Sequence, residues 1–164
     1  MTGETHLSFK RARFSTRLPL THLFTQGHYW LRREAGAKDV WQIGFTKFAL
    51  RMLGDPVEAD FEVGAGQAVE TGQAIGWIEG FKAVADVFAP FDGAFCGMNP
   101  ALAADIDLVK KSPYDSGWLY SLKGEPGEDC LDAEDYASML DGTIDRMLEA
   151  EGHVPESLAD TEAC

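Results

Sequence analysis

Lys82 is the residue in this sequence that is best placed for covalent chemistry. It lies within residues 77–87, WIEGFKAVADV, where two strand-like runs flank a tip that contains glycine. It is the only lysine within residues 52–109. Such a tip protrudes, so its ε-amine would be open to acylation and an attached group would be free to move. On this pattern alone, an ordinary solvated lysine at a turn is the commoner explanation.

The segments around Lys82 are predicted to be short β-strands. Strands this short and evenly spaced favour a small β-sandwich or barrel, so the predicted fold class is mainly β with short helices. Alternating or β-branched runs, bounded by glycines or polar turns, occur at 28–32, 40–45, 57–63, 67–70, 74–79, 83–88, 93–96 and 117–122.

Helices are predicted before and after this β region. Thr46 is suited to be the N-cap of a short helix over residues 47–53, which Gly54 ends. Its apolar residues recur at helical spacing, so we expect it to pack on a sheet. Further helices are expected over 132–140, beginning with an aspartate cap, and over 143–150.

We expect the chain to divide into three parts. Residues 1–27 form a basic N-terminal arm, 28–142 the main domain, and 143–164 a helical or flexible tail. The arm has little helical periodicity, so we expect it to be irregular or to add a strand to the domain. A transit peptide is a less favoured alternative, because the segment lacks an amphipathic pattern.

The charge distribution argues against nucleic-acid binding. The chain carries a net charge of −13; residues 1–35 hold six basic and two acidic residues, so the rest carries −17. An acidic body repels phosphate backbones, although it suits docking to basic protein surfaces. No run approaches the roughly 18 apolar residues of a membrane span, so no membrane association is expected.

The cysteines favour a reducing compartment. Cys96, Cys130 and Cys164 are odd in number, far apart and without a C-x-x-C pair. No apolar signal-peptide core is seen. We therefore expect a cytoplasmic protein, or a mitochondrial one in a eukaryote.

Other catalytic and metal-binding patterns are absent from the sequence. The four histidines lack metal-ligand spacing, and no Gly-x-Ser-x-Gly elbow or nearby Cys–His pair occurs. Residues 64–69 begin like a dinucleotide fingerprint, but Val69 replaces the third glycine. Phe81 and Ala83, rather than methionines, flank Lys82, which argues against a biotin carrier. We predict no catalytic residue and no metal site.

The residues flanking Lys82 carry a family resemblance. The pattern Glu79-x-x-Lys82-Ala83-Val84-x-Asp86 resembles the lipoylation motif of glycine-cleavage H proteins, in which Glu-Ser-Val-Lys-Ala-Val-Ser-Asp surrounds the modified lysine. The resemblance covers about residues 28–142, in order and with similar spacing. The other matching segments are Ile43–Thr46, Met52–Asp55, Ala89–Gly93, Asn99–Leu102, Pro113–Leu119 and Leu131–Tyr136.

The resemblance implies a lipoyl-domain-like barrel-sandwich hybrid with a C-terminal helix and with lipoamide on Lys82. Such a protein is a non-catalytic carrier that shuttles an aminomethyl group and reducing equivalents. Its implied partners are glycine decarboxylase, an aminomethyltransferase, lipoamide dehydrogenase and the lipoyl-attaching ligase. Glu79 and Asp86 flank the lysine and are candidate recognition points for that ligase, or simply keep the hairpin soluble.

Some residues depart from the family pattern and leave alternatives open. Gly80-Phe81 replaces the usual Ser-Val before the lysine, and the N-terminal arm and C-terminal tail are long. An H-like lipoyl carrier that serves a different redox or sulfur-transfer assembly is therefore the second hypothesis. The third is an unmodified structural or regulatory module with the same fold.

Overall fold

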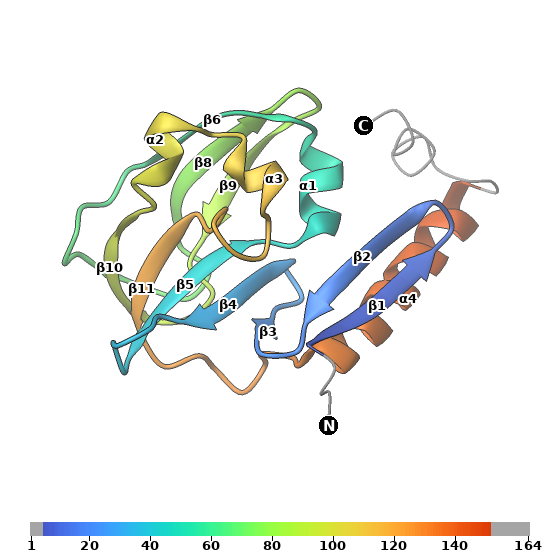
Figure 1. Ribbon diagram of the computed structural model, residues 1–164, viewed down its shortest axis with the longest axis horizontal. Helices are drawn as coiled ribbons and strands as arrows, with labels where there is room; N and C mark the ends of the chain where they lie inside the picture. Colours follow the sequence, from blue (N-terminus) through green and yellow to red (C-terminus); the bar gives the residue numbers. More distant parts are fainter. Residues whose placement is uncertain (1–4, 152–164) are drawn as a thin grey trace.

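Three antiparallel β-sheets and four helices make up the part of the chain that the computed structural model describes, residues 5–151 (Figure 1). The sheets have the strand orders β3-β4-β5-β11-β10-β7, β6-β8-β9 and β1-β2. The strands are β1 His6–Arg11, β2 Phe14–Pro19, β3 Leu23–Phe24, β4 Tyr29–Arg33, β5 Val40–Phe45, β6 Pro56–Phe61, β7 Ala68–Val69, β8 Ala74–Gly80, β9 Val84–Phe88, β10 Gly93–Met98 and β11 Tyr120–Gly124.

The six-stranded and three-stranded sheets pack against each other around the main core. Alternate side chains along each strand point inwards. Ile43 of β5 and Leu122 of β11 therefore share a buried cluster with Ile78 of β8 and Val87 of β9. Each of the eight predicted strands has a counterpart with small shifts at its ends, so the prediction of a mainly β fold is confirmed.

Helix α1, Lys47–Leu53, joins two cores. The Thr46 side chain accepts a hydrogen bond from the Ala49 N–H at 3.4 Å, and Gly54 ends the helix, as predicted. Leu53 is buried in the main core, whereas Phe48 is buried in a second core. The position of α1 is therefore held from both sides.

The N-terminal residues form a β-hairpin, so the expectation of an irregular arm is wrong for residues 6–19. The alternative, that the arm adds a strand to the domain, is confirmed by β3, which pairs with β4. Phe14 and Leu18 alternate with exposed residues along β2 and are fully buried in the second core. At the hairpin turn, Arg11 forms ion pairs with Asp141, at 2.7 Å, and with Asp145. These carboxylates lie some 130 residues away, so the sequence offered no local sign of this pairing.

Helix α4, Ala133–Glu151, is continuous, so the predicted break between two short helices is wrong. Asp132 caps it, because its carboxylate accepts from the Asp135 N–H at 2.8 Å. Tyr136, Leu140 and Ile144 continue one apolar stripe along the helix and are fully buried against the hairpin. The burial of these side chains outweighs the cost of about 1 kcal/mol for Gly142 in the middle of the helix.

Two short helices, α2 Ala101–Ala104 and α3 Leu108–Lys111, fill the segment between β10 and β11. They were not predicted, since four residues show no periodicity. None of the helices within residues 5–151 has the length and apolar character needed to cross a bilayer. Of the predicted C-terminal tail, residues 143–151 are part of α4, and residues 152–164 lie outside the described residues.

Substitution Phe14→Ala tests whether the hairpin is part of the folded unit. Because Phe14 is fully buried among the side chains of α4 and α1, we expect the free energy of unfolding to fall by about 3–5 kcal/mol. Chemical denaturation measures it. The exposed neighbour Ser15→Ala is the control and should change stability by less than about 0.5 kcal/mol. Equal stability of the two variants would mean that the hairpin does not belong to the core.

Candidate functional site

Lys82 lies at the tip of the hairpin formed by β8 and β9. The Gly80 N–H donates to the Ala83 carbonyl oxygen at 2.8 Å, which leaves Phe81 and Lys82 at the turn. Phe81 is 80% exposed, and the Lys82 side chain is also exposed. The lysine amine is therefore accessible to a modifying enzyme.

The backbone of this tip is tied to the end of α1. The Lys82 N–H donates to the Leu53 carbonyl oxygen, and the Phe81 N–H donates to that of Asp55, each at 3.0 Å. The Lys82 ammonium Nζ lies 3.4 Å from the Arg51 carbonyl oxygen, to which it donates. The main chain of the tip is thus fixed, while the end of its lysine reaches solvent.

Two glycines allow the close approach of the tip to α1. Gly54 has φ +83°, and a Cβ atom built there would lie 2.9 Å from the Lys82 nitrogen. A Cβ atom at Gly80 would lie 2.3 Å from the Leu53 carbonyl oxygen. Both distances are shorter than real Cβ contacts, so any side chain would push the tip away from the helix.

Glu79 and Asp86 lie on one face of the three-stranded sheet. Asp86 is paired with Trp77, two residues from Glu79 on the same strand, so the two carboxylates point to the same side. On β6, Glu58 lies opposite Glu79 and Asp60 lies opposite Trp77. We call these four carboxylates the acidic face. It adjoins the tip on the β6–β8–β9 sheet.

A groove of about 370 Å³ runs between α1 and β9, next to the tip. Most of its lining is apolar, and Ala83 follows Lys82 directly, so a chain attached to the lysine could enter it. We call it the α1–β9 groove. It is lined by Gly27, His28, Tyr29, Phe45, Phe48, Ala49, Met52, Leu53, Ala83, Ala85, Asp86 and Phe88.

A hydrogen-bond network supports one wall of the α1–β9 groove. His28 Nδ1 lies 2.8 Å from the Tyr136 hydroxyl, which lies 2.8 Å from the Thr46 hydroxyl at the start of α1. Burial lowers the pKa of His28 from 6.5 to about 4, so the ring is neutral at neutral pH. Sequence reasoning missed this network, because Tyr136 lies 108 residues beyond His28.

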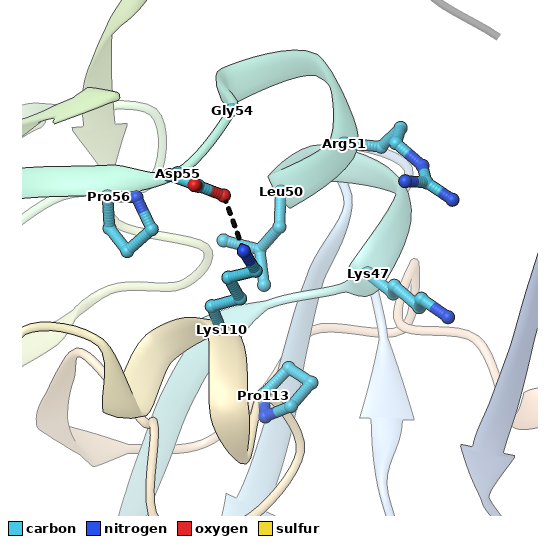
Figure 2. Close-up of a pocket in the computed structure, with 8 residues that line it drawn as sticks. All are labelled: Lys47, Leu50, Arg51, Gly54, Asp55, Pro56, Lys110 and Pro113. Carbon is cyan, nitrogen blue, oxygen red and sulfur yellow. Dashed lines mark hydrogen bonds and ion pairs between the residues drawn. The ribbon is translucent and has the colours of Figure 1, made fainter. Parts of the chain in front are cut away.

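A second hollow, of about 220 Å³, lies between α1 and α3 (Figure 2). Lys47 and Arg51 extend from the same side of α1, and Lys110 of α3 forms an ion pair with Asp55 at 2.7 Å. We call it the cationic hollow. Leu50, Gly54, Pro56 and Pro113 complete its lining.

Within residues 5–151, no group of three or more His, Cys, Asp and Glu side chains is arranged so that it could hold a metal ion. His22 is buried, and its Nε2 lies 2.8 Å from the Tyr114 carbonyl oxygen, which is a structural contact. Cys96 and Cys130 are free thiols.

Comparisons with known proteins agree on one family. The family model for the glycine cleavage H-protein matches residues 22–143. The glycine cleavage system H protein of Bacteroides thetaiotaomicron is 37% identical over 122 residues, which cover 73% of this chain and 94% of that protein. The glycine cleavage system H protein of Micrococcus luteus is 40% identical over 119 residues, which cover 70% of this chain and 91% of that protein. The crystal structure of the Mycobacterium marinum H protein is similar, with TM-score 0.66, 30% identity, and coverage of 75% of this chain and 98% of that one.

Substitution Gly54→Ala tests the contact between the tip and α1. We expect a loss of about 1–3 kcal/mol from the positive φ, increased by the clash with Lys82. Gly36→Ala is the matched control, because Gly36 also has a positive φ, +78°, but nothing lies within 4 Å of its added Cβ. Denaturant unfolding should rank Gly54→Ala as the less stable variant. Equal losses would contradict a close contact.

The buried histidine predicts a pH dependence. The pKa of His28 is lowered to about 4, so between about 6.5 and 4 the unfolded chain binds a proton that the folded chain does not. Stability should therefore fall as the pH is lowered through this window. Substitution His28→Asn, which tolerates the positive φ of +70° there, should flatten the curve. His22, whose pKa burial also lowers, remains in both proteins. If the free energy of unfolding fell equally with pH in the wild type and in His28→Asn, the result would contradict the role of His28.

Proposed function

The chain belongs to the glycine cleavage H-protein family, and from this membership we propose that Lys82 carries a covalent lipoyl group. The protein is a carrier in glycine cleavage that shuttles an aminomethyl group and reducing equivalents. Its fold is the lipoyl-domain-like barrel-sandwich hybrid of that family, with a C-terminal helix.

The exposed amine at a fixed tip is the observation that supports this site. The ligase transfers the lipoyl acyl group from an activated carboxyl to Nζ of Lys82, with release of the activating group and a proton. The product is a neutral amide, so no charge has to be desolvated when the arm enters a partner. The tip backbone is held by the Leu53 and Asp55 carbonyl oxygens. A ligase therefore meets one defined geometry, while the side chain retains its reach.

The α1–β9 groove is the proposed resting place of the loaded arm. The arm consists of methylene groups and a dithiolane ring, which gain from contact with an apolar wall such as that of Phe48 and Met52. Its only acidic lining residue is Asp86, and the neutral His28 contributes no positive charge. The groove thus suits an apolar arm whose end carries a neutral group or a cationic amine.

Glu79 and Asp86 are the proposed recognition points for the lipoyl-attaching ligase. They lie on one face, on the two strands that lead to the lysine, so they would approach a ligase together with the tip. The proposed partners of the loaded carrier are the decarboxylase, the aminomethyltransferase and the lipoamide dehydrogenase of glycine cleavage. The chemistry belongs to those enzymes, so the carrier itself is proposed to be non-catalytic.

Substitution Lys82→Arg tests the attachment site. Arginine keeps the charge but its guanidinium is not acylated, so intact-mass analysis from a lipoate-competent cell should show no lipoyl adduct. Lys38→Arg, in the exposed β4–β5 turn, should be modified as fully as the wild type. A lipoyl adduct on Lys82→Arg would contradict the site. An unmodified wild-type chain would favour the structural-module hypothesis, and a lipoylated chain that never accepts the aminomethyl group would favour another assembly.

A further inference from the structure

The cationic hollow concentrates positive charge in an acidic protein. The chain has 27 acidic and 14 basic residues. Three of the basic residues, Lys47, Arg51 and Lys110, line this hollow together with a single acid, Asp55. Lys111 lies beside Lys110 in the last turn of α3. We call these four basic residues the cationic strip.

The adjoining surface continues the strip towards the N-terminal hairpin. A wider hollow of about 860 Å³ shares Lys47 and Lys110 with the cationic hollow and adds Arg17 and Arg32. Among its lining residues, Asp115 is the only carboxylate, and it forms an ion pair with Arg32. Positive charge therefore extends across both hollows, from α1 and α3 to the N-terminal hairpin.

Lys47 is unfavourable for the helix that carries it, whereas Arg51 lies in the last turn, where the helix dipole favours a cation. Lys47 occupies the first turn, where the helix dipole favours acids, and that turn has no acidic residue. Arg51 follows four residues later, which places two like charges on neighbouring turns. Burial and the nearby Arg51 lower the pKa of Lys47. A feature that opposes local stability is expected where a surface serves binding.

The strip lies beside the lysine tip. Lys82 Nζ donates to the Arg51 carbonyl oxygen at 3.4 Å. The Phe81 N–H donates to the carbonyl oxygen of Asp55, whose side chain pairs with Lys110. A partner that encloses Lys82 would therefore also meet the strip, of which Figure 2 draws Lys47, Arg51 and Lys110.

We propose that the cationic strip is a docking surface for a carboxylate-bearing rim around the entrance of an enzyme that receives the Lys82 arm. The proposal rests on the proposed lipoyl function of Lys82. The tip therefore adjoins two surfaces of opposite charge, the cationic strip and the acidic face on the three-stranded sheet. A partner with complementary charges around its entrance would bind in one orientation. The overall charge of −13 disfavours a nucleic-acid occupant. Lys110 and Lys111 pair with Asp55 and Asp105, but exposed pairs of this kind are weak and can exchange partners.

The test uses the full-length, lipoylated protein as the substrate of each of the three glycine-cleavage enzymes. The variants are Lys47→Glu and the double variant Lys47→Glu/Lys111→Glu. Glutamate at position 47 suits the helix N-terminus, so folding should be retained. Lys38→Glu is the control for Lys47→Glu, because it makes the same charge change in the exposed β4–β5 turn, at the opposite end of β5 from α1. For the double variant the control is Lys38→Glu/Lys123→Glu, which makes the same total charge change at exposed positions away from the strip. Intact mass first verifies that every variant is fully lipoylated.

With at least one enzyme, we expect the double variant to raise KM for the carrier about tenfold at low ionic strength, with kcat unchanged. The difference in KM between the double variant and the wild type should vanish in about 1 M salt, where the Debye length is about 3 Å. Both controls should match the wild type. An unchanged or lowered KM with all three enzymes would overturn the docking surface, while wild-type turnover would show that the lipoyl function stands. Loss of lipoylation in the wild type would instead refute the function itself.

Discussion

The contact between the β8–β9 tip and the end of α1 is the constraint on which the site depends. Two backbone hydrogen bonds join Lys82 to Leu53, the last residue of α1, and Phe81 to Asp55 just after it. Because Gly54 and Gly80 have no Cβ atom, the two backbones can approach this closely. The lysine that is proposed to carry the arm is therefore attached to a backbone held by hydrogen bonds, so its side chain can extend while its main chain stays in place.

The second core extends this rigidity to the whole helix. Phe48 packs with the hairpin residue Phe14 at 5.5 Å between ring centroids. Tyr136 of α4 bonds both His28 and the Thr46 cap. The N-terminal hairpin and the C-terminal helix thus act on the site indirectly, because they fix the helix against which the lysine tip is docked and which forms one wall of the α1–β9 groove.

Local sequence patterns predicted the elements whose burial alternates along the chain. The strands around Lys82 and the capped helix after Thr46 follow period 2 and period 3.6, which depend only on neighbouring residues. The same reasoning failed for residues 6–19 and for the break expected near residue 142. In both places the secondary structure is decided by burial against residues more than 100 positions away in the chain, which a local pattern does not contain.

The sequence alone determined the family resemblance, the mainly β class and the choice of Lys82, because these rest on residue types at short spacing. Only the tertiary structure decided which surfaces surround that lysine. The α1–β9 groove, the acidic face and the cationic strip each join residues from separate elements. Their formation depends on how the sheets and helices pack, and distances between segments far apart in the chain are set by that packing rather than by any one segment.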